Sequence, residues 1–163
     1  MRRQWKRWLL GVALLLIAIQ FVRPERTNPA GDPAQTLQAS LPVSPEVEAI
    51  LDRSCSDCHS DRTVWPWYSG LAPASWLVIS DVNEGRGKLN FSRWTSYKAE
   101  RQGRLLDKMC QEVTKGDMPL SQYILIHRGA KLRGQDAQVI CGWTKMARSR
   151  LGSATQNQTG RQN

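Results

Sequence analysis

The stretch 44-SPEVEAILDRSCSDCH-59 carries the clearest helix signal in the chain and leads directly into two closely spaced cysteines. Ser44 is a good N-cap, Pro45 suits the first helical position, and the acidic residues after it favour the positive end of a helix. Val47, Ile50 and Leu51 recur at helical spacing. The stretch therefore predicts a helix that begins after Ser44 and runs into Cys55.

Three further segments show apolar residues at helical spacing, whereas strand signals are almost absent. One begins near Pro73 and is expected to stop at Gly85, the next covers about 96–115 and precedes a glycine, and the last begins near Gly134. Their expected core residues are Trp76, Leu77, Ile79, Val82, Leu105, Leu106, Met109, Val113, Val139, Ile140, Trp143 and Met146 or Ala147. These patterns predict an all-α domain.

Cys55-Ser-Asp-Cys58-His59 is a Cys-x-x-Cys-His string, the pattern of c-type haem attachment. Two thiols one helical turn apart reach the two vinyl groups on one edge of the porphyrin, and the adjacent histidine then lies under the iron. A zinc ribbon needs a second Cys-x-x-Cys, but the other two cysteines stand singly, and a thioredoxin-type pair needs a βαβ setting. We therefore expect one covalently attached haem c on Cys55 and Cys58, with His59 as an axial ligand.

Met118 is the favoured ligand for the other face of the iron. Met118 follows a glycine that is expected to end a helix, and it precedes Pro119. Met109 and Met146 instead lie on the apolar faces of predicted helices, where methionines usually pack in the core. A thioether ligand raises the reduction potential and suits electron transfer. His127 is the only other histidine. It is a rival axial ligand, but we favour a polar role in which it donates to a backbone carbonyl or a haem propionate.

The amino terminus combines four cations before Trp8 with an uncharged run over residues 9–22. This pattern is typical of an export signal, and Trp5 and Trp8 suit a membrane interface. No small-residue cleavage site directly follows the run, so we favour a retained anchor over a cleaved signal. The sequence predicts an N-terminal transmembrane helix in the inner membrane, with the remaining chain in the periplasm.

The net charge of +9 is concentrated at that end of the chain. Residues 1–26 hold six basic side chains against one acidic, and residues 27–163 hold 17 against 13. A nucleic-acid-binding domain concentrates positive charge on its folded part, so no nucleic-acid partner is expected. The predicted organisation is a signal anchor (1–26), a linker (27–43), the haem domain (44–150) and a disordered polar tail (151–163).

Several aromatic residues follow the haem string and can wall a haem, since each combines a large flat surface with one polar donor. Those expected to do so are Trp65, Trp67 and Tyr68. Arg62, Arg86 and Arg104 can pair with propionates, although for each a solvated surface charge is favoured. Cys110 and Cys141 lie beside core stripes, and they form either a disulfide or buried free thiols.

The sequence resembles bacterial exported or membrane-anchored haem-binding domains of the small cytochrome c type. The resemblance rests on CSDCHS with the following WPWYS, on APASW, on EGR with LNFS, and on Met118-Pro119 with Tyr123 and His127 downstream. It implies covalent haem on Cys55 and Cys58 with His59 below, and it supports Met118 as the distal ligand. Tyr123 and His127 are further candidate pocket residues.

Together these features predict a membrane-tethered monohaem cytochrome that exchanges single electrons with redox partner proteins. No catalytic triad, carboxylate pair or phosphate loop is evident, so an electron carrier is favoured over an enzyme. The alternatives are a haem sensor or peroxidase-like enzyme with an open distal site, in which His127 acts as acid or base, and an accessory haem subunit of a membrane complex.

Overall fold

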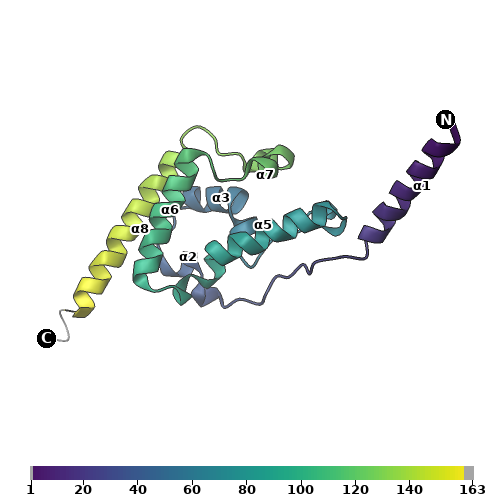
Figure 1. Cartoon of the computed structure of the whole chain (residues 1–163). Helices are drawn as coiled ribbons and strands as arrows, with labels where there is room; N and C mark the ends of the chain where they lie inside the picture. The colour runs from purple at the N-terminus through teal and green to yellow at the C-terminus, as the bar shows by residue number, and fades with distance from the viewer. Residues whose placement is uncertain (1, 160–163) are drawn as a thin grey trace.

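The computed structural model describes residues 2–159, and it describes side chains over residues 4–153. Every regular element in this part of the chain is helical, as the sequence predicts (Figure 1). The α-helices are α1 (Arg2–Ile19), α2 (Leu37–Ser40), α3 (Pro45–Ser54), α4 (Ser56–His59), α5 (Ala74–Lys88), α6 (Ala99–Lys115), α7 (Ser121–Ile126) and α8 (Asp136–Thr159). Short 3-10 helices are η1 (Pro33–Gln35), η2 (Trp67–Gly70), η3 (Phe91–Ser96) and η4 (Arg128–Ala130).

Helix α3 forms as its sequence predicts. The Ser44 hydroxyl accepts a hydrogen bond from the Val47 amide at 3.3 Å, which satisfies one of the free donors of the first turn. Val47, Ile50 and Leu51 are buried in the main core. The helix ends at Ser54, and α4 follows after Cys55 with the rest of the Cys-x-x-Cys-His motif (residues 55–59), called the haem string.

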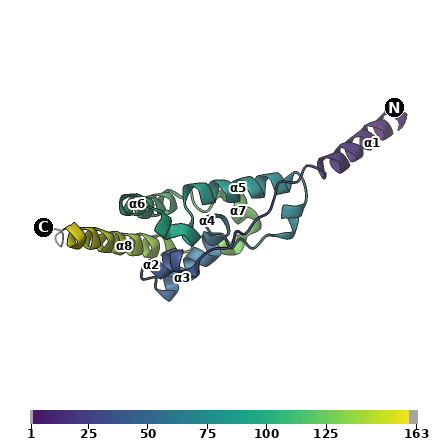
Figure 2. The same ribbon diagram turned by 90° about the horizontal axis from the view of Figure 1, so that it is seen from below.

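Helices α6 and α8 lie side by side and form one wall of the domain (Figures 1 and 2). The buried residues at their contact are Leu106, Met109, Ile140, Trp143 and Ala147, so Ala147 rather than the exposed Met146 faces the core. Cys110 and Cys141 join the two helices through a disulfide. Gly116, at φ 76°, ends α6 in the left-handed conformation expected after its last turn.

Helix α5 differs from its prediction at Gly85. The helix continues through this glycine to Lys88, so Gly85 is not a helix stop. It is buried, and a Cβ atom at this position would lie 2.5 Å from the Cys58 carbonyl oxygen. Gly85 is therefore required by the close packing of α5 against α4 and not by a turn.

The N-terminal part of the fold prediction needs correction. No helix within the described residues is long and apolar enough to cross a membrane. Charged residues occupy the first turns of α1, so its uncharged part covers only residues 8–19. At 1.5 Å per residue this part is about 18 Å long, whereas the hydrocarbon core of a bilayer is about 30 Å thick. The predicted transmembrane helix, and the single-pass inner-membrane location that depended on it, are therefore wrong.

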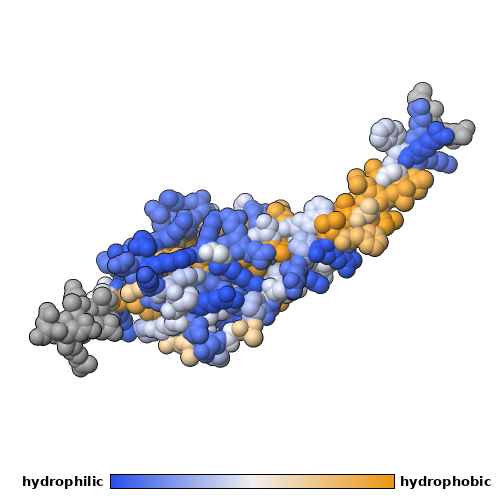
Figure 3. Space-filling view, turned by 60° about the horizontal axis from the view of Figure 1, so that its bottom comes forward, coloured by the Kyte–Doolittle hydropathy of each residue, from blue (hydrophilic) through white to orange (hydrophobic). Residues whose placement is uncertain are grey.

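Helix α1 nevertheless exposes apolar side chains on all sides, visible as the orange band in Figure 3. The chain that follows it is held against the folded part. Gln20 exchanges two hydrogen bonds with the backbone of Ala72, both at 3.0 Å, and the Trp76 indole donates to the Val22 carbonyl at 2.7 Å. Residues 20–28 thus run along the domain surface.

The two other flanking segments also contain ordered structure. Within the predicted linker, Leu37 and Leu41 are buried in the main core, and the Trp143 indole donates to the Pro42 carbonyl at 3.0 Å. At the other end, α8 extends to Thr159, beyond the expected domain boundary at 150. Residues 160–163 of the predicted disordered tail lie outside the described residues.

Candidate functional site

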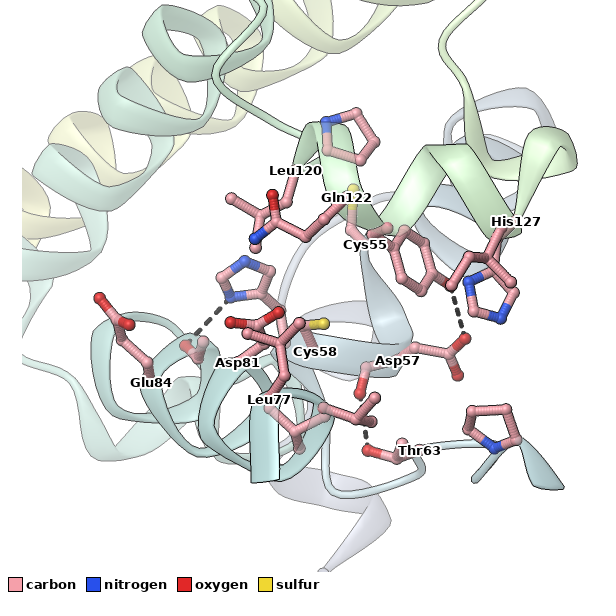
Figure 4. Close-up of a pocket in the computed structure, with 18 of the residues that line it drawn as sticks. Cys55, Asp57, Cys58, Thr63, Leu77, Asp81, Glu84, Leu120, Gln122 and His127 are labelled. Atoms are coloured by element: carbon pink, nitrogen blue, oxygen red, sulfur yellow. Dashed lines mark hydrogen bonds between the residues drawn. The ribbon is translucent and has the colours of Figure 1, made fainter. Parts of the chain in front are cut away.

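A cavity of about 290 Å³ lies between the haem string, α5 and the segment that leads into α7 (Figure 4). Its lining includes most of the predicted site residues, which come from four separate parts of the chain. These are Cys55, Cys58, His59, Tyr68, Met118, Tyr123 and His127. The fold therefore brings together residues that the sequence separates by as many as 72 positions.

Cys55 and Cys58 are free thiols at the cavity wall. The amides of Cys58 and His59 both donate to the Cys55 carbonyl, at 3.2 and 3.0 Å, so a helical turn holds the string. Burial raises the pKa of Cys55 to about 12 and that of Cys58 to about 11. Both sulfurs are therefore protonated thiols at neutral pH.

The His59 ring is fixed by two backbone carbonyls. Its Nδ1 atom lies 3.1 Å from the Gly85 oxygen and 3.0 Å from the Leu89 oxygen. Because carbonyl oxygens only accept hydrogen bonds, the proton is on Nδ1 and the lone pair is on Nε2. Burial lowers the pKa of His59, which favours the neutral ring. A neutral imidazole with an anchored Nδ1–H is the form that binds iron.

Met118 reaches the cavity from the turn after α6. The amides of Asp117 and Met118 donate to the Glu112 carbonyl at 3.0 and 3.3 Å, so the helix end fixes the start of this segment. Pro119 and Leu120 line the same wall. The structure thus places a thioether and an imidazole, His59, in one cavity.

A polar corner of the cavity is formed by Asp57, Tyr68, Tyr123 and His127. The Tyr123 hydroxyl donates to the Asp57 carboxylate at 2.7 Å, and the Tyr123 and His127 rings stack at 4.3 Å. The Tyr68 hydroxyl lies 3.2 Å from Nε2 of His127. Burial, with a further contribution from Asp57, raises the pKa of Tyr123, which keeps its phenol protonated as a donor.

Two of the predicted aromatic wall residues are not at the cavity. Tyr68 lines it, but Trp65 and Trp67 do not, and Trp67 is 81% exposed and packs edge-on against Tyr68. Arg86 is not a solvated surface charge. Its guanidinium donates to the carbonyls of Ser60 and Thr27 and to the side chains of Asn28 and Thr63. Arg62 and Arg104 are exposed.

The residues present fit a haem in two respects. The exposed apolar side chains of Leu77, Leu125 and Ile126 line the cavity, and a flat apolar ligand there would cover them. In addition, Nδ1 of His127 is buried without a hydrogen-bond partner among the described residues, so a donor or acceptor of the ligand would satisfy it. An iron porphyrin supplies both an apolar plate and polar propionates.

Several residues that shape the site were not predicted. Asp57 has no special signal inside the Cys-x-x-Cys spacing, and Gly85 resembles an ordinary helix stop. Leu125 and Ile126 lie in a short apolar run whose pattern fits a strand as well as a helix. A search for small residues one helical turn from a predicted core position would have found Gly85.

An all-α domain with a cavity lined by two thiols, an anchored imidazole and a thioether has the donor set of a haem protein. The model of a protein family described as haem-binding domain matches residues 14–146. The chain therefore belongs to this haem-binding domain family. No curated protein and no solved structure matches the chain.

Proposed function

We propose that this protein is a monohaem c-type cytochrome that passes single electrons between redox partner proteins. One observation carries the proposal: a single cavity brings the thiols of Cys55 and Cys58, the anchored ring of His59 and the thioether of Met118 together. The bound haem supplies the one-electron Fe(III)/Fe(II) couple.

Cys55 and Cys58 would hold the haem covalently, each through a carbon–sulfur bond to one vinyl group. Such an addition would place the thiol hydrogen on the other vinyl carbon and would need no external oxidant. The raised pKa values of both thiols keep the hydrogen on sulfur at neutral pH.

His59 and Met118 would supply the two protein ligands to the iron, an imidazole nitrogen and a thioether sulfur. The bonds from His59 Nδ1 to the Gly85 and Leu89 carbonyls fix the ring orientation and raise the basicity of Nε2. A thioether as the second ligand raises the potential and fills the coordination shell, which suits electron transfer without small-molecule binding. The exposed side chains of Leu77 and Leu125, which line the cavity, would be covered by the bound haem.

The attachment is tested by acid extraction of the purified haem-loaded protein. We expect the wild type to retain its haem and the Cys55→Ala/Cys58→Ala variant to release it. The pair Cys110 and Cys141 provides the control, because replacing both by Ala leaves the string intact. Release of haem from the wild type would contradict covalent attachment.

The ligation is tested by the spectrum and the midpoint potential of Met118→Ala. We expect the methionine-to-iron charge-transfer band to disappear and the potential to fall. Met146→Ala is the matched control, because Met146 is exposed on α8 and does not line the cavity. An unchanged spectrum in Met118→Ala would eliminate this ligand.

A second candidate is a haem sensor or peroxidase-like enzyme with an open distal site. The observation that favours it is His127, which lines the cavity with a buried and unpartnered Nδ1. In such a protein this nitrogen is a suitable acid or base for a bound small molecule. Rapid carbon monoxide binding to the untreated reduced wild type favours this function, whereas slow binding favours the cytochrome.

A further inference from the structure

We infer that Asp57 and Tyr123 are positioning residues for Met118: their hydrogen bond ties the segment that carries the distal ligand to the helical turn that carries Cys55 and Cys58. The inference rests on the proposed function, because it concerns the ligation of the same iron. Neither residue is proposed to touch the iron.

Asp57 is held rigidly on the haem-string side. It lies between Cys55 and Cys58 in α4. One carboxylate oxygen accepts from the Val64 amide at 2.9 Å and the other from the Tyr123 hydroxyl at 2.7 Å. Its backbone carbonyl accepts from the Thr63 hydroxyl at 2.6 Å. The Val64 amide therefore holds the carboxylate, and the Thr63 hydroxyl holds the backbone of the same residue, independently of the contact with α7 (Figure 4).

Tyr123 receives this contact on α7, five positions after Met118. Its ring stacks on His127, and His127 meets Tyr68 of η2. Gln122 and Asp81 of α5 both line the cavity. Polar side-chain contacts therefore connect α7 and the adjoining His127 to α4 and η2, and the contact with α4 is the one between Tyr123 and Asp57.

These contacts matter because α7 has little else to hold it. Within the described side chains α7 has no buried residue, and Leu125 and Ile126 are exposed. The Met118 segment is fixed at its start by the Glu112 carbonyl at the end of α6. Its other end depends on α7, so the position of the thioether depends on the contacts of Tyr123.

Loss of the Tyr123 hydroxyl should therefore release Met118 from the iron more often. A hydrogen bond to a charged acceptor contributes enough that its loss shifts such an equilibrium by roughly tenfold or more. Since carbon monoxide binds only where the methionine has left, its association rate reports the released fraction. We expect this rate to rise by roughly tenfold in Tyr123→Phe.

The experiment measures carbon monoxide association, the charge-transfer band and the midpoint potential in the haem-loaded protein. The variants are Tyr123→Phe, Asp57→Ala and the double variant. If the two residues act through one bond, the double variant should bind carbon monoxide no faster than the faster single variant. Tyr97→Phe is the matched control, because it removes a hydroxyl that accepts from the Asn90 amide at 2.9 Å, away from α7.

The outcomes separate the inference from the proposed function. A wild type without the charge-transfer band, binding carbon monoxide freely, contradicts ligation by Met118 and the positioning role with it. A wild type with the band, together with a Tyr123→Phe variant that behaves like Tyr97→Phe, overturns the positioning role alone. Faster binding in Tyr123→Phe and not in Tyr97→Phe supports it.

Discussion

Gly85, which has no side chain, determines how closely two helices approach at the candidate site. Its backbone lies against the Cys58 carbonyl, and its own carbonyl accepts from His59 Nδ1 at 3.1 Å. The same residue therefore permits the approach of α5 to α4 and helps to orient the His59 ring. A larger residue would disturb both at once.

Gly85→Ala should lower the free energy of unfolding by about 1–3 kcal/mol, because the new methyl group meets backbone atoms that cannot rotate away. The haem content of the purified protein should fall with it. Gly87→Ala is the control on the same helix. No atom lies within 4 Å of its added Cβ, so this change should be neutral or stabilise α5 by up to about 1 kcal/mol.

Chemical denaturation and haem quantification of the two variants check this prediction. Equal stability of Gly85→Ala and Gly87→Ala would show that the approach of the two helices is not tight.

At the scale of elements, the disulfide between Cys110 and Cys141 joins α6 and α8, the two helices that form one wall of the domain. The helices also share a buried apolar contact, and Arg148 of α8 forms a salt bridge with Asp107 of α6. The salt bridge is exposed and contributes little. The covalent link and the apolar contact are therefore the main connections between α6 and α8.

Replacing Cys110 and Cys141 by Ala should lower the free energy of unfolding by about 3–4 kcal/mol, the chain-entropy value for a loop of this length. The measurement is urea denaturation with and without reductant. Reductant should destabilise the wild type and leave the double variant unchanged. A wild type insensitive to reductant, although its disulfide is reduced, would contradict the prediction.

The same elements show how far sequence reasoning reaches. The cap at Ser44 and the apolar faces of α3, α6 and α8 are local patterns, and each has the predicted structure. The role of Gly85 depends on the approach of another helix, and the Asp57 to Tyr123 contact joins residues 66 positions apart. Spacing can single out Gly85 as a small residue near the core, but it does not show which helix lies against it or that Tyr123 meets Asp57.

The error at α1 has a different origin. The cations, the interfacial tryptophans and the uncharged run over 9–22 favour an anchor, but α1 ends at Ile19 and is not long and apolar enough to cross a membrane. The sequence predicts that Trp67 walls the haem, but this side chain is exposed. The closely spaced aromatic residues Trp65, Trp67 and Tyr68 do not by themselves show which ring faces the cavity.

At the scale of the whole molecule, Arg86 connects three parts of the chain. Its guanidinium binds Ser60 beside the haem string, Thr63 in the following loop, and Thr27 and Asn28 of the N-terminal segment. It also lies 3.8 Å from the buried carboxylate of Asp61, which Arg93 and Asn90 contact as well. The N-terminal segment therefore belongs to the folded unit that carries the site.

Arg86→Gln should lower the free energy of unfolding by about 2–4 kcal/mol, because several buried oxygens lose their donor. It should also speed proteolytic cleavage between residues 23 and 36, since Thr27 and Asn28 lose their contacts. Arg62→Gln is the control, because the Arg62 side chain is exposed. Denaturation and limited proteolysis check both effects; equal cleavage rates in the two variants would contradict this role.

The location of the disulfide has a consequence for the biogenesis of the protein. Four cysteines allow three pairings, and covalent haem attachment under the proposed function requires that one pair stays reduced while the other is oxidised. The native fold separates them, with Cys110 and Cys141 between α6 and α8 and the other two at the cavity. Under the proposed function, oxidative folding therefore has to leave Cys55 and Cys58 unjoined, or a reductant has to reopen a bond between them before haem attachment, while the α6–α8 disulfide is kept.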